Sequence, residues 1–304
     1  MSGSSPDSLT GFVNLYKPDD MTSSDAVCIV RGVLSRVIGG RQKAGHLGTL
    51  DPLAEGVLPI ALGKATRLFD LLAFKTKRYK AQFTFGTATD TLDRGGKTVS
   101  VGGRIPLREE IEAVLPRFIG ETEQIPPAFS AKSVDGKRAY AYARQGVAPD
   151  LPPKRIRIDS FELTGGEDGT FNFDIECGGG TYIRALARDV ATALGTTAYM
   201  SALTRTRSGV FTVENSVSLD LFRNAPEKCI IPVEYALTAY PEKILDGRET
   251  EKILNGIPVR CETTESLTAK PEFCEEIFRV KAEDGVLLGI GKSTKDGLKL
   301  TIRL

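Results

Sequence analysis

The sequence predicts an α+β protein: a mixed, largely antiparallel sheet with peripheral helices, followed by a small β-rich module. Three observations predict this class. Residues 78–85 alternate between apolar and polar side chains, as in a strand with one buried face. Residues 26–37 place apolar side chains at helical spacing. Beyond about residue 242, short apolar runs are separated by Asp-Gly turns, a pattern typical of small β modules.

The helices are indicated by spacing and by capping residues. A surface helix is expected over residues 23–37, with its cap at Ser24 or Asp25 and a pair of glycines after its last turn. A second helix, started by a proline, is expected at 106–119, where Pro116 disturbs the last turn. Both helices are expected to lie on the periphery.

The strands are indicated by alternation and by glycine boundaries. The run from Gly56 to Gly63 is short and apolar, as in a buried strand, and Pro59 within it marks an irregularity or a sheet edge. In the strand at 78–85, Tyr79 is expected to face the core. Further elements are expected as strands at about 155–163, 171–177 and 200–213 and as a helix near 181–194.

Composition excludes several classes of chemistry. The 304 residues include one histidine, His46, and five scattered cysteines without a C-x-x-C pair, so neither a zinc site nor a disulfide framework is expected. Neither G-x-x-x-x-G-K-[ST] nor G-x-G-x-x-G occurs, so a nucleotide cofactor is not expected either. We therefore expect ordinary side chains to carry the chemistry, with no metal and no cofactor.

Targeting signals are not evident in the sequence. Residues 1–10 are rich in Ser and Gly without an apolar stretch, and we expect them to form a disordered tail. A run of 18 apolar residues, as needed to span a membrane, does not occur. These features favour a cytoplasmic protein without a membrane partner.

Charge is unevenly distributed although the net charge is only +1. Residues 64–82 hold six basic residues against one acid, and residues 132–157 hold seven against two. Such separation suggests a basic face for phosphate groups, but solvated surfaces are often locally lopsided, so charge alone leaves both interpretations open. The segment 124–146 mixes basic and aromatic side chains and resembles a mobile insertion.

The segment from Gly45 to Leu58 places an acid, Asp51, and a histidine among three glycines in one short stretch. From these residues alone the segment is a tight structural turn, because Asp-Pro and Gly punctuate turns routinely. Asp51 would then cap the structure that follows. Close approach of another group to this backbone is the functional alternative.

The same segment, His46-Leu-Gly-Thr-Leu-Asp-Pro-Leu-Ala-Glu-Gly-Val-Leu58, resembles the G-x-L-D-P-x-A-x-G-x-L signature of TruB-type pseudouridine synthases. An ordered series of motifs is far more specific than one motif. The resemblance covers roughly residues 11–212 and is weak beyond them. Six further segments resemble that family's motifs in family order: Asn14–Pro18, Lys77–Tyr79, Gln124–Pro126, Tyr142–Gly146, Gly180–Arg184 and Leu203–Arg207.

The resemblance implies a pseudouridine synthase fold in a catalytic domain at 11–241, and a TruB C-terminal or PUA-like RNA-binding module at 242–304. It implies conversion of one uridine, position 55 in the T loop of tRNA, to pseudouridine after base flipping. This reaction breaks the N1–C1′ bond and forms a C5–C1′ bond. An ionised carboxylate can add to the ribose or the base, or stabilise positive charge at C1′, so the reaction requires no cofactor.

The resemblance also implies the catalytic residues. Asp51 matches the essential aspartate, Tyr79 the active-site tyrosine that stacks on the target base, and Arg184 the arginine that pairs with the aspartate. From the sequence pattern alone, Tyr79 is interpreted as a core residue, and the alternative for Arg184 is a solvated helix arginine.

Three more residues match substrate-binding positions. His46 matches the histidine beside the flipped nucleotide, while Tyr182 and Leu203 match positions that line the pocket. Without the resemblance, Tyr182 and Leu203 are interpreted as core residues.

The implied partner is tRNA, bound through its T arm. The residues of the Asp51 motif favour a stand-alone enzyme without a guide RNA or an obligate protein partner. Two alternatives stay open: a tRNA-folding factor without turnover, and an enzyme of the same fold with broader RNA targets. A binding factor would not need Asp51, Tyr79 and Arg184 together, so the enzyme is the favoured hypothesis.

Overall fold

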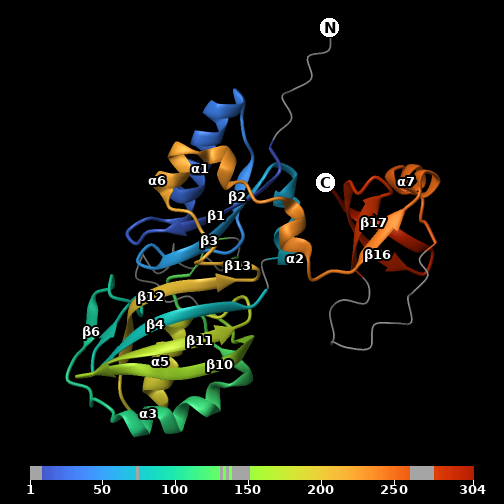
Figure 1. Ribbon diagram of the computed structural model, residues 1–304. Coiled ribbons are helices and arrows are strands. Elements are labelled where there is room, and N and C mark those ends of the chain that lie inside the picture. The colour runs from blue at the N-terminus through green and yellow to red at the C-terminus, as the bar shows by residue number, and fades with distance from the viewer. Residues whose placement is uncertain (1–8, 73–74, 131–132, 135–136, 139–150, 261–276) are drawn as a thin grey trace.

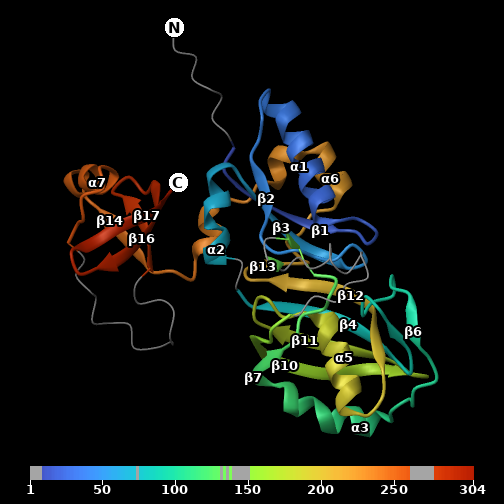
Figure 2. The ribbon, with the colours of Figure 1, turned by 180° about the vertical axis from the view of Figure 1, so that it is seen from behind.

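A computed structural model describes residues 9–72, 75–130, 133–134, 137–138, 151–260 and 277–304. It shows a main α+β domain with a smaller β module beside it (Figures 1 and 2). Part of the predicted disordered tail is packed: Leu9 lies against the core, and its carbonyl accepts a hydrogen bond of 2.6 Å from Gln42 Nε2. The other residues of that tail, 1–8, lie outside the described part.

The main domain is organised around one large sheet. Within the described residues it has nine strands in the order β1-β3-β12-β4-β11-β10-β7, with β2 beside β3 and β13 beside β12. β3 and β12 pair in parallel, and the other neighbours pair antiparallel, which confirms the mixed, largely antiparallel class. The strands are β1 (Gly11–Lys17), β2 (Ala44–His46), β3 (Glu55–Leu62), β4 (Lys77–Phe85), β7 (Gly120–Gln124), β10 (Lys154–Glu167), β11 (Thr170–Cys177), β12 (Ala198–Ser208) and β13 (Phe211–Thr212).

Helices and short strands surround this sheet. The α-helices are α1 (Ser23–Ile38), α2 (Phe69–Leu72), α3 (Arg108–Val114), α5 (Ile183–Ala193) and α6 (Leu219–Asn224). The 3₁₀ helices are η1 (Gly63–Leu68), η2 (Leu115–Phe118), η3 (Pro226–Cys229) and η4 (Val233–Leu237). Two short strand pairs join β5 (Ala88–Thr89) to β6 (Thr98–Ser100) and β8 (Ser133–Val134) to β9 (Lys137–Arg138). In the described part of the chain, no helix is long and apolar enough to cross a membrane.

The cap of α1 lies two residues before the earliest predicted position. Thr22 is the N-cap: its hydroxyl accepts a hydrogen bond of 3.0 Å from the Asp25 N–H, and the Asp25 carboxylate accepts one of 3.2 Å from the Thr22 N–H. Asp25 therefore completes a capping box instead of capping the helix itself. The predicted glycine end is confirmed, because Gly39 has a left-handed φ of 73°.

Both prolines act where the sequence predicted irregularity. Pro59 lies at the point of β3 where its neighbour changes, because Ile60 is paired with β2 whereas Glu55 and Gly56 are paired with β12. Its carbonyl still accepts a hydrogen bond of 2.9 Å from the Leu47 N–H. Pro116 falls in η2, so the predicted helix changes from α to 3₁₀ geometry after Val114.

The alternation in β4 is confirmed, and Tyr79 faces the core as predicted. The buried face of the sheet is covered by α5 and α3, and the large core cluster includes residues from all three (Figure 2). Phe83 packs against Phe173 with ring centroids 4.6 Å apart and against Phe161 at 6.4 Å. This apolar floor holds β4, β11 and β12 in fixed register beneath the loops at their ends.

The β module has a four-stranded sheet in the order β14-β15-β16-β17. It consists of β14 (Glu242–Leu245), α7 (Gly247–Leu254), β15 (Ile277–Ala282), β16 (Leu287–Thr294) and β17 (Gly297–Arg303). Ile290 of the module shares a core cluster with Leu68 of η1 and Leu237 of η4. Arg67 Nη1 donates a hydrogen bond of 2.9 Å to the Arg303 carbonyl. The module is thus docked on the segment that joins β3 to β4.

Candidate active site

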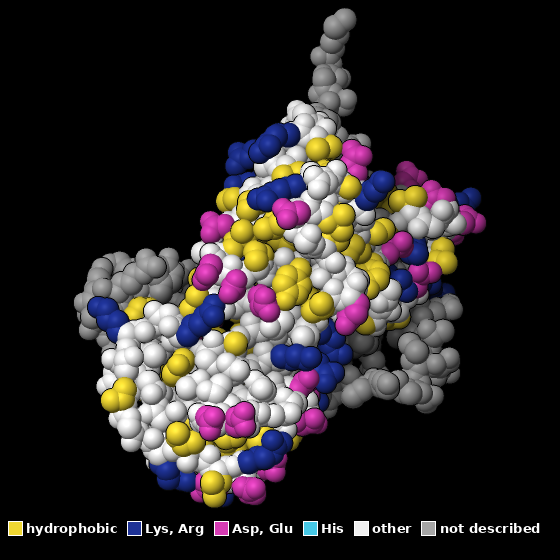
Figure 3. Space-filling model, turned by 60° about the vertical axis from the view of Figure 1, so that its left-hand side comes forward, with side chains coloured by type: hydrophobic (Ala, Val, Ile, Leu, Met, Phe, Trp, Pro, Cys, Tyr) yellow, Lys and Arg dark blue, Asp and Glu magenta, His cyan; other side chains and the backbone are white. Residues whose placement is uncertain are grey.

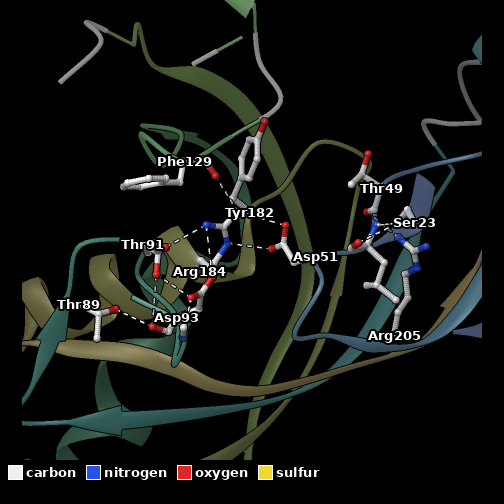
Figure 4. Close-up of polar contacts among 12 residues, drawn as sticks. Ser23, Thr49, Asp51, Thr89, Thr91, Asp93, Phe129, Tyr182, Arg184 and Arg205 are labelled. Carbon is white, nitrogen blue, oxygen red and sulfur yellow. Dashed lines mark hydrogen bonds and ion pairs between the residues drawn. The ribbon is translucent and has the colours of Figure 1, made fainter. Parts of the chain in front are cut away.

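The loop between β2 and β3 carries Asp51, and α5 supplies the arginine that meets it (Figure 4). Arg184 Nη2 donates a hydrogen bond of 3.2 Å to Asp51 Oδ1, and Nε lies 2.8 Å from Oδ2. The second contact is an ion pair whose angle is not that of a hydrogen bond. The fold therefore joins two predicted site residues that are 133 positions apart.

Arg184 is buried and its guanidinium is fixed on several sides. Nη1 donates to the Thr91 carbonyl at 2.9 Å, and Nη2 donates to the Phe129 carbonyl at 3.0 Å. Asp93 Oδ2 lies 3.6 Å from Nη1. The arginine consequently lies between two carboxylates, with only that of Asp51 substantially exposed, at 32% of its side chain.

Asp93 is a site residue that the sequence analysis missed. It is buried, and its Oδ1 accepts hydrogen bonds from Thr91 Oγ1 at 2.6 Å and from the Gly95 N–H at 3.0 Å. Thr89 Oγ1 donates to its carbonyl at 2.7 Å. The only signal in the sequence was a turn-like stretch with two aspartates and two glycines at residues 90–96, which gives no indication of the distant arginine.

The Asp51 loop is held from the side of β1 and α1. Lys17 is fully buried, and its Nζ donates to the carbonyls of Met21 at 2.7 Å and Pro52 at 3.2 Å. The Ser23 hydroxyl donates to the Leu50 carbonyl at 2.7 Å and accepts from the Leu50 N–H at 2.9 Å. Burial lowers the pKa of Lys17 to about 8.

A second buried cation holds the loop from β12. Arg205 is 1% exposed and donates to three carbonyls, those of Val57 at 2.7 Å, Thr49 at 3.2 Å and Gly48 at 3.1 Å. Arg205 lies within the motif Leu203–Arg207, but nothing in that motif indicated a role for it. Its spacing on an alternating strand does not distinguish it from an outward-facing arginine.

Tyr79 lies opposite Arg205 in the β4–β12 register and is 6% exposed. Burial raises the pKa of Tyr79 to about 12, partly offset by the charge of Arg205 and a hydrogen bond with it. Its hydroxyl is therefore protonated at neutral pH. Lys77, two residues earlier and also buried, has its pKa lowered to about 8, first by burial and then by the Arg205 charge.

The three predicted substrate-binding residues lie in different environments. His46 ends β2, its Nδ1 is buried without a hydrogen-bond partner in the described part of the chain, and burial lowers its pKa. Tyr182 is the N-cap of α5, and Figure 4 shows its ring beside the Asp51–Arg184 pair with the hydroxyl directed away. Leu203 is 6% exposed in the core cluster that also contains Tyr79 and Leu50.

The base of the predicted insertion is tied to the same helix. Gln124 is buried, and its side-chain amide accepts from the Tyr182 N–H at 2.9 Å and donates to the Tyr182 carbonyl at 3.1 Å. Arg188 Nη2 donates to the Ile125 carbonyl at 2.9 Å. Much of the predicted insertion at 124–146, including residues 139–146, lies outside the described residues.

The surface shown in Figure 3 carries both acidic and basic side chains. Figure 3 shows acidic and basic side chains interspersed over one face, with Lys and Arg grouped toward its upper end. Among the described residues, no group of three or more His, Cys, Asp or Glu is arranged as a metal site.

Comparison with known proteins identifies the class to which this fold and site belong. Residues 36–183 match the N-terminal domain model of TruB family pseudouridylate synthases, and residues 184–238 match a tRNA pseudouridylate synthase B C-terminal domain. Residues 242–304 lie beyond both matches. The fold is also that of a chain in a crystal structure of a Cbf5-Nop10-Gar1 complex, with a TM-score of 0.67 and 25% identity over 96% of this chain and 79% of that one.

Two curated relatives narrow the class. The tRNA pseudouridine synthase B of Geobacillus kaustophilus is 42% identical over 83% of this chain and 91% of its own length. That of Caulobacter sp. strain K31 is 41% identical over 82% of this chain and 81% of its own length. The chain belongs to the TruB family of pseudouridylate synthases.

Proposed function

We propose that this protein converts one uridine of tRNA, position 55 in the T loop, to pseudouridine, with Asp51 as its catalytic carboxylate. The observation that carries the proposal is the Asp51–Arg184 pair: an acid one-third exposed, aimed by a buried arginine, on a loop fixed from two sides. Such a carboxylate is held in one direction by its cation while keeping a surface open to a substrate.

The reaction needs one charged group at the sugar–base bond. When N1–C1′ breaks, positive charge develops on the ribose or a covalent bond forms to the carboxylate, and the base then turns and reattaches through C5. The proton leaves C5 for solvent and N1 takes one up from solvent, so atoms balance without a cofactor. The protein must supply position and electrostatic stabilisation, and Arg184 provides the first by fixing Asp51.

Tyr79 and the three substrate-binding residues complete the proposed site. Tyr79 presents a neutral ring because burial raises its pKa to about 12, which suits stacking on a base and donation of a hydrogen bond. His46 carries a lowered pKa, so it is neutral at neutral pH and its ring can fill the space left by the flipped nucleotide. We assign Tyr182 and Leu203 to the walls of the pocket.

The proposed partner is the T arm of tRNA, engaged without a guide RNA or an obligate protein partner, and the proposed location is the cytoplasm. We assign residues 11–241 to catalysis, with the insertion at 124–146 closing on the RNA. Residues 242–304 would act as a PUA-like RNA-binding module. Its docking on η1 supports a fixed position relative to the catalytic domain.

The test uses unmodified tRNA transcripts tritiated at uridine C5, with purified protein and no added cofactor. We expect tritium release that maps to one T-loop uridine and is lost in Asp51→Asn, while that variant still binds tRNA. Tight binding without release by the wild type would instead support a tRNA-folding factor. Release from several sites would indicate an enzyme with broader targets.

A further inference from the structure

Buried positive charge is concentrated around the Asp51 loop. Among the described residues, four Lys or Arg are buried, and all four lie at this loop or its carboxylate: Lys17, Lys77, Arg184 and Arg205. Burying a charge is costly unless it is well paired, so its concentration at one place indicates a function other than stability.

Arg205 differs from Arg184 in its partners. Arg184 meets two carboxylates, whereas no ion pair of Arg205 with a carboxylate occurs within the described ranges. All three nitrogens of its guanidinium are used on backbone carbonyls instead. The planar guanidinium donates in fixed directions, so it can bond to three carbonyls at once. The compact ammonium of a lysine cannot reproduce this geometry.

These carbonyls bracket the reactive residue in the chain. Gly48 and Thr49 precede Asp51 in the loop, and Val57 follows it in β3. One side chain thus ties both arms of the turn to strand β12, and Figure 4 shows it near Thr49. Gly48 has a φ of 146°, a region that other residues rarely adopt, so its carbonyl direction depends on this glycine.

The backbone of β12 packs directly against the start of β3, where the Asp51 loop ends. A Cβ added at Gly56 would lie 2.3 Å from the Arg205 carbonyl oxygen, so the backbone of Arg205 already touches the start of β3. Tyr79 lies opposite Arg205 in the sheet, and the charge of Arg205 offsets part of the rise in the Tyr79 pKa. Arg205 therefore contacts the frame of the site on three sides and is 1% exposed, so it cannot touch the RNA itself.

We propose that Arg205 is a positioning residue for catalysis, which holds the Asp51 loop in its reactive geometry through its three carbonyl hydrogen bonds. This inference rests on the proposed function, since it assigns Arg205 a role in the reaction of Asp51. A displacement of about 1 Å in a reacting group costs on the order of 100-fold in rate. The effect should fall on kcat and leave tRNA affinity intact.

The experiment measures single-turnover kcat, tRNA Kd and thermal unfolding for Arg205→Met and Arg205→Lys. We expect kcat about 100-fold lower in Arg205→Met and intermediate in Arg205→Lys, which keeps a donor but not the fork, with Kd within about twofold in both. The matched control is Arg279→Lys, because Arg279 Nε also donates to a backbone carbonyl, that of Tyr240 at 2.9 Å, in the distant β module. Its kcat should equal that of the wild type.

Two outcomes would overturn the proposal: kcat within threefold of the wild type in both variants, or losses of kcat and tRNA affinity that match each other and follow a lowered melting temperature. Arg205→Lys keeps the fold accessible if Arg205→Met does not fold. Asp51→Asn and the wild type are measured in the same assay. Absence of wild-type turnover would refute the proposed function, whereas an active Arg205→Met enzyme would refute only the role of Arg205.

Discussion

The Asp51 loop and the junction with the β module use charged side chains in opposite ways. At the loop, Lys17 and Arg205 are fully buried and bond to backbone carbonyls. At the junction, Lys281 pairs with Glu234 at 2.7 Å and Glu242 at 3.0 Å, and these acids are 43% and 32% exposed. The junction only has to hold the β module against the main domain. The Asp51 loop has to hold one carboxylate in one direction, and this requirement accounts for the costly buried charge there.

The largest effect is expected at the carboxylate itself. Asp51→Asn keeps the size of the side chain but removes its charge, so kcat should fall at least ~10³-fold while tRNA affinity is retained. The matched control is Asp174→Asn, because Asp174 also pairs with an arginine, Arg78, but on the outer face of the sheet. Tritium release from both variants measures this difference, and equal activities would remove Asp51 from its role.

The next effect is expected at the arginine that aims the carboxylate. In Arg184→Lys, one ammonium cannot contact Asp51 and also bond to the carbonyls of Thr91 and Phe129, so kcat should fall about 100-fold. Arg223→Lys, at a surface pair with Asp220, is the control and should leave kcat unchanged. Single-turnover rates report the chemical step directly. An Arg184→Lys enzyme as fast as the control would show that the ion pair is structural.

A third difference concerns pH and stability. Burial lowers the pKa of Lys17 and Lys77 to about 8 from an ordinary value of 10.5. Below about pH 8 both are charged in folded and unfolded chains, and the burial penalty is fully present. From pH 8 upward the unfolded chain binds more protons, so stability rises with pH. The raised pKa of Tyr79 opposes this trend above about pH 10, where the unfolded tyrosine ionises first.

A comparison of the wild type with Lys77→Met measures the contribution of Lys77 to the pH dependence of the unfolding free energy. Between pH 7.5 and 9.5 the wild type should gain about 2 kcal/mol more in unfolding free energy than the variant. Urea unfolding at the two pH values measures the gain. Parallel curves for the two proteins would mean that Lys77 titrates normally in the folded state.

The smallest effect is expected at the junction. Lys281→Met removes two ion pairs that are partly exposed, and such pairs contribute little to stability, so kcat and melting temperature should both stay close to those of the wild type. Tritium release and thermal unfolding check this. A kcat that fell more than fivefold would show that docking of the module controls the site, and the contrast between the two regions would no longer hold.

Local patterns in the sequence were sufficient to predict the features that depend on residues adjacent in the chain. The alternation at 78–85 and the glycine end of α1 were confirmed because side-chain period and left-handed φ are local properties. The cap of α1 was placed wrongly, since Ser24 and Asp25 satisfy the same composition rule as Thr22. Only the reciprocal hydrogen bonds between Thr22 and Asp25 distinguish them.

In the candidate site, too, some features followed from short segments of sequence and others only from tertiary contacts. The sequence by itself determined the family motifs, the position of Asp51 on a glycine-rich loop and the inward direction of Tyr79, because each lies within one short segment. Only the tertiary structure decided that Asp93 would face Arg184 and that Arg205 would clamp Gly48 and Val57. These contacts join residues from separate strands and loops, so their geometry follows from sheet order and register, which short-range patterns do not encode.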